Sequence, residues 1–235
     1  MKGNLKAAGL RTPGSALERV EAALNVEPTG ADPKAQRFAV TADAALEGLH
    51  LADPALRRAL GSRAKLTLRA AAGSDGVLDV STLVLDADTA RVSYAGRLGQ
   101  NTLTGTVDAA LADIGAFSGV AGRNLAGRLD ATAALSGDPA RKALSADLDL
   151  RGGGLVLGEA VADRLVGRAP TLTGRIFQTY DGYGFDRLRF DGAEMFATLQ
   201  GKADARTADV AARIDLKTCP PSTSGCSDWR ASMRG

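Results

Sequence analysis

A two-residue period in hydrophobicity runs through most of this 235-residue chain and limits the folds open to it. In residues 144–151, leucines and one alanine at even positions alternate with serine, aspartates and arginine at odd positions. Residues 65–70, 102–111 and 128–135 alternate in the same way. Successive side chains of a strand point to opposite faces, so each segment is typical of a strand with one dry and one wet face. The chain is therefore expected to be mostly β.

Short turn signals separate these segments, among them Ser74-Asp75-Gly76 and Asp181-Gly182. Such connections are too short for a crossover and favour antiparallel pairing. Aromatic residues make up only 4% of the chain, so the apolar side must be built from Leu, Val and Ala. We expect a repetitive, curled antiparallel sheet, groove-like or solenoid-like, with two or three short helices. Further strands are expected at residues 38–46, 83–85, 90–98, 172–177, 188–190, 195–199 and 210–216.

Helix signals are few. Ser15-Ala16-Leu17-Glu18 matches a capping box and predicts a short helix to about residue 24. Asp53-Pro54 predicts a second helix, with Asp as N-cap and Pro at the first helical position, which Gly61 ends. Residues 159–166 predict a third.

The chain also matches itself at an offset of 106 residues, which becomes 105 further along. Gly48-Leu49-His50-Leu51 then meets Gly154-Leu155-Val156-Leu157. Repeated units of this kind bury their apolar faces by stacking on their neighbours. We interpret residues 1–37 as an N-terminal segment with a short helix, 38–143 as a first β repeat unit and 144–217 as a second, incomplete unit.

Composition changes abruptly after residue 217. Residues 218–235 hold both cysteines, Cys219 and Cys226, and the only tryptophan, Trp229. This tail is interpreted as disordered or as non-native sequence after a truncated or shifted reading frame. The cysteines either form a small disulfide loop in an oxidising compartment or are accidental.

Several function classes have no support. A net charge of +2 with interleaved signs gives no electrostatic footprint for nucleic acid. No apolar run approaches the roughly 18 residues that a membrane span needs. The single histidine, His50, and two late cysteines offer few metal ligands. Residues 122–129 lack the lysine and hydroxyl of a phosphate-binding loop, and no nucleophile elbow occurs. Asp147 and Asp149 fit a solvated strand face better than a glycosidase pair. We expect no enzyme, cofactor or metal.

One stretch, residues 127–148, has a strand, a Ser-Gly turn with proline and a second amphipathic strand. It resembles the translocation and assembly module TamB family, and residues 53–61 and 120–127 look like that family's linking segments. The resemblance covers residues 38–217. It implies a fragment of a periplasmic protein whose full-length relatives are anchored in the inner membrane, the anchor being absent from this chain. It also implies a trough-shaped sheet, an outer-membrane barrel of the Omp85 type as partner, and roles in protein secretion, outer-membrane protein assembly and phospholipid transport.

The residues support such a role independently. A sheet with one aliphatic face must cover it, because apolar area in water costs roughly 25 cal/mol per Å². With few aromatic side chains to fill a curled sheet, phospholipid acyl chains are the natural occupants. The alternative is a structural β-solenoid or adhesin-like repeat with a filled core and no transport role. Candidate lining positions are Leu66, Leu68, Leu83, Leu85, Val92, Tyr94, Leu103, Val107, Leu129, Leu135, Leu144, Leu148, Leu172, Leu188 and Phe190.

Overall fold

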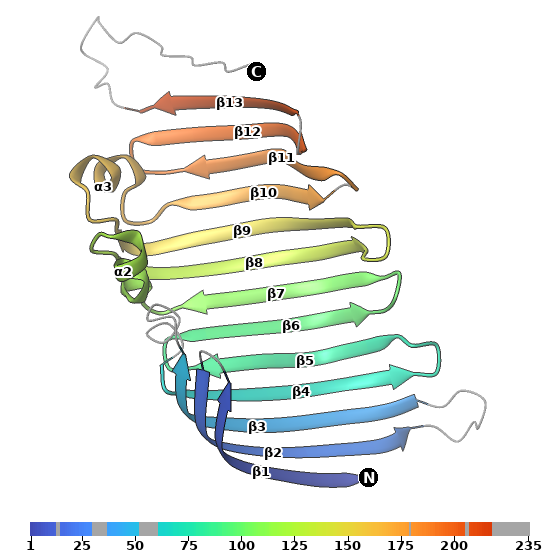
Figure 1. The fold of residues 1–235 in the computed structure, drawn as a ribbon. Helices are drawn as coiled ribbons and strands as arrows, with labels where there is room; N and C mark the ends of the chain where they lie inside the picture. Colours follow the sequence, from blue (N-terminus) through green and yellow to red (C-terminus); the bar gives the residue numbers. More distant parts are fainter. Residues whose placement is uncertain (13–14, 30–36, 52–60, 179, 205–206, 218–235) are drawn as a thin grey trace, which may run out of the picture.

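The computed structural model describes residues 1–12, 15–29, 37–51, 61–178, 180–204 and 207–217. They form one antiparallel sheet of 13 strands, in which each strand pairs with its neighbours in the sequence (Figure 1). The first and last strands are not paired with each other, so the sheet does not close. This confirms the predicted mostly β, repetitive antiparallel architecture. The strands are β1 (Lys2–Thr12), β2 (Ser15–Thr29), β3 (Arg37–Leu51), β4 (Arg63–Gly73), β5 (Leu78–Ala87), β6 (Ala90–Leu98), β7 (Leu103–Leu111), β8 (Ala126–Asp138), β9 (Ala143–Val156), β10 (Thr171–Gln178), β11 (Gly182–Asp191), β12 (Met195–Asp204) and β13 (Ala208–Leu216).

Short helices connect some of the strands and lie on one side of the sheet, at the strand ends (Figure 1). The 3-10 turn η1 (Ile114–Phe117) and α2 (Ser118–Ala121) connect β7 to β8, and α3 (Ala160–Val166) connects β9 to β10. Helix α3 lies within the predicted residues 159–166. The helix predicted from Asp53-Pro54 falls on residues 52–60, which lie outside the described residues. None of the helices in the described ranges has the length and apolar character needed to cross a membrane.

The helix predicted over residues 15–24 is wrong, because this segment belongs to β2. Leu17, Val20 and Leu24 have helical spacing, but Ala22, Leu24 and Val26 also alternate with period two. Strand β2 pairs with both β1 and β3, and hydrogen bonds on both sides outweigh a local capping signal. Strands β1 and β2, at the N-terminal end of the chain, are therefore part of the same sheet.

The second half of the sheet repeats the first at a nearly constant interval. The first residue of β12 lies 105 residues after the first residue of β6, and the same interval separates the first residues of β13 and β7. The register shifts between Val80 and Leu83 on β5, and again between Phe185 and Leu188 on β11, also 105 residues later. These intervals match the offset seen in the sequence.

Two glycines bend the N-terminal strands. Gly9 on β1 and Gly48 on β3 have φ of 68° and 66°, a left-handed conformation that favours glycine. The register of β1–β2 skips Gly9, and that of β2–β3 skips Gly48 and its neighbour Glu18. Beyond this level the ends of β1, β2 and β3 turn out of the plane of the sheet (Figure 1). The glycines thus set the curl at this corner.

Few side chains of the described sheet are buried. The buried apolar residues are small or lie near the helical edge, and no large side chain there is fully buried. A single sheet has no second layer to cover its apolar side. The buried apolar residues are Ala64, Ala70, Val80, Ala90, Ala116 and Leu155.

Candidate functional site

One row of apolar side chains crosses the entire sheet at right angles to the strands. Strand register links each residue of this central row directly to the next, and each of the 13 strands contributes one member. Directly paired residues lie on the same face of a sheet. The central row is Leu5, Ala22, Ala44, Leu66, Leu85, Val92, Ala109, Ala131, Leu150, Leu172, Phe190, Ala197 and Ile214.

Parallel rows widen this surface into an apolar face. On one side of the central row, register joins Leu24, Ala42, Leu68, Leu83, Tyr94, Val107, Ala133 and Leu148. Further along the strands it joins Val26, Val40, Ala70, Val80, Gly96, Gly105, Leu135, Ala146, Ile176, Phe185, Gly201 and Val210. The β-bulges of β5 and β11 preserve the pattern, because two residues between Val80 and Leu83, and between Phe185 and Leu188, keep both members of each pair on this face.

The structure places all fifteen predicted lining residues on this apolar face. Leu66, Leu85, Val92, Leu172 and Phe190 belong to the central row. The others occupy the rows beside it, and register brings them together across the turns, which the sequence pattern could not do. They are Leu68, Leu83, Tyr94, Leu103, Val107, Leu129, Leu135, Leu144, Leu148 and Leu188.

The sequence interpretation missed other members of this face. Ala22 and Ala44 were missed because residues 15–24 looked helical and alanine is a weak strand signal. Ile176, Phe185 and Ile214 lie within or beside predicted strands, and their alternation with polar neighbours could have identified them.

Every member of the central row is half-buried or exposed, whereas Ala70 and Val80, in a parallel row of the same face, are buried. Val92 keeps 39% of its surface exposed, and Leu5 and Ile214 at the two ends keep 62% and 45%. At about 4.8 Å between strands, the 13 strands extend the face to roughly 58 Å. This is a large continuous apolar surface for a single chain.

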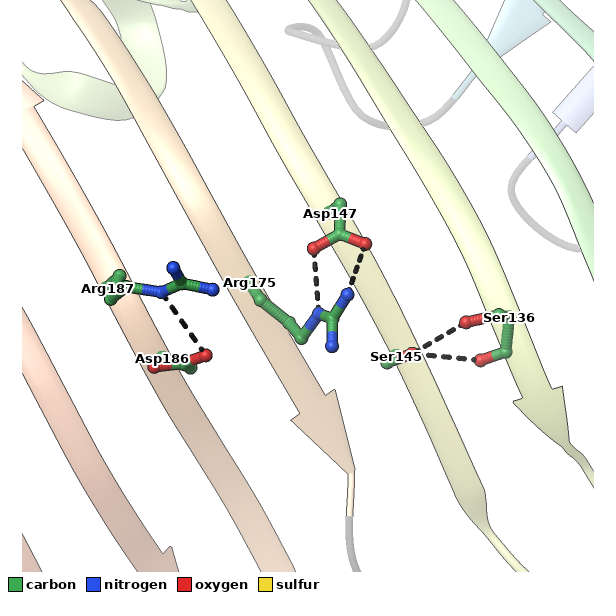
Figure 2. Close-up of polar contacts among 6 residues, drawn as sticks. All are labelled: Ser136, Ser145, Asp147, Arg175, Asp186 and Arg187. Carbon is green, nitrogen blue, oxygen red and sulfur yellow. Dashed lines mark hydrogen bonds and ion pairs between the residues drawn. The ribbon is translucent and has the colours of Figure 1, made fainter.

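The opposite face carries charges that pair across strands. The Arg175 guanidinium on β10 donates two hydrogen bonds to the Asp147 carboxylate on β9, at 2.7 and 2.8 Å (Figure 2). The hydroxyls of Ser136 and Ser145 lie 2.8 Å apart beside them. The hydrogen bonds and charge of Arg175 hold the pKa of Asp147 below its usual value. The charged side chains of this face are exposed to solvent.

The two aspartates considered as a glycosidase pair, Asp147 and Asp149, have separate arginine partners. Arg151 donates to Asp149 at 2.7 and 3.0 Å and lowers the pKa of that carboxyl. Both groups are exposed ion pairs with pKa values below normal, whereas a general acid needs a raised pKa. The Asp147–Arg175 pair joins β9 to β10, whereas Asp149 and Arg151 pair within β9.

The charged groups that line one hollow on the polar face already have hydrogen-bonding or ion-pair partners. This hollow, of about 390 Å³, lies between Arg91, Asp108 and Arg151. Arg91 pairs with Asp86 at 3.3 Å, and Asp108 accepts a hydrogen bond from Thr132 at 2.8 Å. No group of three or more potential metal ligands forms within the described ranges. The side chain of His50 and all of residues 218–235, with both cysteines, lie outside the described residues.

Tyr94 brings the one hydroxyl among the predicted lining residues. It donates to the Thr104 carbonyl at 3.0 Å, and the Arg97 carbonyl lies 3.3 Å away. Its ring lies beside Gly105, where a Cβ would come within 2.7 Å of a ring carbon. Burial raises the pKa of this phenol, so it stays neutral. The ring therefore adds apolar surface where the Gly96–Gly105 pair supplies none.

Comparisons of the chain with protein-family models, with curated proteins and with solved structures found no match.

Proposed function

We propose that this chain forms a hydrophobic β groove of a TamB-like periplasmic protein, along which phospholipid acyl chains pass between the inner and outer membranes. The central row carries the proposal, because it offers apolar contact on each of the 13 strands without a polar interruption. The family resemblance adds protein secretion and outer-membrane protein assembly as related roles, with an Omp85-type barrel as partner.

The energetics favour an acyl chain as occupant. Exposing a 16-carbon chain to water costs about 0.8 kcal/mol per methylene, or roughly 12 kcal/mol in total. Contact with the apolar face recovers part of this cost and also covers side chains such as Val92 and Leu148. One leaflet's acyl chain spans about 15 Å, half of the ~30 Å hydrocarbon core, so the roughly 58 Å face has room for several positions.

The composition of the face favours sliding over tight binding. Each step of one strand, about 4.8 Å, exchanges one Leu, Val or Ala contact for another of similar kind. No single residue then dominates affinity, and the headgroup remains in water. The charged opposite face keeps the sheet soluble on its other side.

The filled-core solenoid is the weaker alternative. A filled core requires the apolar side chains to be enclosed, yet only six apolar residues in the described part of the chain are buried, four of them alanines. A single open sheet therefore favours an apolar face that a ligand covers over a core that is filled by the chain's own side chains.

A binding assay with a matched pair of variants tests the proposal. The purified chain is titrated with a fluorescent 16-carbon fatty acid below its micelle concentration. Val107→Asp places a charge on the apolar face, and Thr106→Asp places it on the exposed opposite face of β7. We expect at least tenfold weaker binding for Val107→Asp and unchanged binding for Thr106→Asp. Equal effects of the two substitutions, or no binding by the wild-type chain, would overturn the proposal.

A further inference from the structure

Strands β1 and β13 form the two edges of the sheet, and neither pairs on its outer side among the described residues. Their apolar side chains are correspondingly exposed: Leu5 keeps 62%, Ile214 45% and Leu216 57% of their surfaces. Edge strands present unpaired backbone groups that can bind another strand. The backbone and side chains of β13 can therefore be compared with those of β1 as the two halves of an interface between copies of the chain.

The backbone of each edge alternates between groups that face the sheet and groups that face outward. On β13, the Lys217 amide donates to Glu194 and the Thr207 carbonyl accepts from Asp204, so odd-numbered residues face the sheet. Residues 210, 212 and 214 then face outward. On β1, the Met1 carbonyl accepts from the Val26 amide, so odd-numbered residues face β2 and Asn4 and Lys6 face outward.

We propose that β13 of one copy pairs with β1 of a second copy, head to tail and in parallel. An odd number of strands makes β1 and β13 run in the same direction. In a parallel pair, a residue bonds to the two residues that flank the one opposite it. With Ile214 opposite Leu5 of the second copy, the outward groups of Ile214 meet those of Asn4 and Lys6.

The same register also places compatible side chains beside one another on both faces of the sheet. Ile214 and Leu5 are the two ends of the central row, so the row continues from one copy into the next. On the polar face, Asp215 comes to lie beside Lys6. Full antiparallel overlap of two β13 strands instead sets Asp209 against Asp215 twice, and like charges placed directly opposite are destabilising. The outward backbone groups, the apolar row and the charges thus all favour this arrangement over pairing of two β13 strands.

Such a contact joins two different surfaces and leaves a free β1 and a free β13 at the ends. It therefore builds linear assemblies in which the apolar face lengthens by 13 strands with each copy. The interface is one strand wide, so assembly depends on protein concentration. This inference does not depend on what occupies the apolar face.

Charge exchange across the interface tests it. Lys6→Glu would face Asp215, and Asp215→Lys would face Lys6, so each variant alone is expected to self-associate at least tenfold more weakly than the wild type. An equimolar mixture of the two restores opposite charges at each junction between unlike variants, so alternating assemblies are expected to associate like the wild type. Sedimentation velocity over about 1–200 μM measures association.

Far-UV circular dichroism checks folding, since the variants remove the exposed intrachain pairs Lys6–Glu21 (3.2 Å) and Arg213–Asp215 (2.7 Å). A wild-type chain that stays monomeric over the whole range would overturn the inference. So would association that both variants leave intact, which would indicate stacking of apolar faces, or variants that the mixture fails to rescue.

Discussion

At the scale of single residues, the polar face pairs its strands through individual ion pairs. Asp147 and Arg175 are Cα partners in the register of β9 and β10 and form a two-bond pair. The apolar face repeats every two residues and tolerates a two-residue slip. Such a slip would part Asp147 from Arg175, so charged pairs of this kind help to select the register.

The ion pair at Asp147 predicts a pH-dependent stability. Its pKa in the folded chain lies below the unfolded value, so the pair stabilises the fold above the unfolded pKa, and this contribution disappears as pH falls through the folded pKa. Asp147→Asn should lower the free energy of unfolding at pH 7, with a difference from wild type that narrows as the pH falls below the ordinary Asp pKa of about 3.9. Urea denaturation at several pH values measures this difference.

Asp108→Asn is the matched control, because the partner of Asp108 is the neutral hydroxyl of Thr132. It should show a smaller difference from wild type at pH 7. A difference for Asp147→Asn that persists unchanged to pH 2 would contradict the assigned role of the carboxylate.

At the scale of elements, alternation predicted most strands well because most have one polar and one apolar face. Strand β8, whose residues alternate between exposed and half-buried along most of its length, is the clearest case. Strand β2 failed because a local capping pattern competed with pairing to two neighbours, which is a non-local interaction. The bulges on β5 and β11 were not predicted either, since an extra residue in a strand is defined only against its partner.

The candidate site was predicted in part. Its fifteen residues were chosen strand by strand, and each strand's apolar side was readable on its own. The sequence could not show that these sides join, because the relative facing of two strands depends on turn geometry and bulges. Nor could it show the row reaching Leu5 and Ile214.

The openness of the apolar face predicts mild effects of truncation in its strands. Leu148→Ala in β9 should lower the free energy of unfolding by about 1 kcal/mol, because Leu148 is only half-buried, whereas a sealed core would give about 2–5 kcal/mol. Ala64→Leu, at one of the buried positions, should be the more damaging change because it overpacks the site. Denaturant unfolding compares the two. A loss above 3 kcal/mol for Leu148→Ala would indicate an enclosed core.

At the scale of the whole molecule, two chemically different faces extend across the same 13 strands. The apolar face is uninterrupted in its central row, and the polar face carries cross-strand pairs. The sheet thus separates the apolar face from the polar face over roughly 58 Å. This separation is what the proposed passage of acyl chains requires.

A photocrosslinking scan along β7 measures which face of the sheet lipid contacts. A benzophenone amino acid replaces each residue from Leu103 to Leu111 in turn, except Gly105, where an added Cβ would collide with the Tyr94 ring, and the chain is irradiated with phospholipid vesicles. We predict lipid adducts at residues 103, 107 and 109 and none at residues 104, 106 and 108, so that the adducts follow the apolar face. Adducts at all positions alike, or at none, would contradict this prediction.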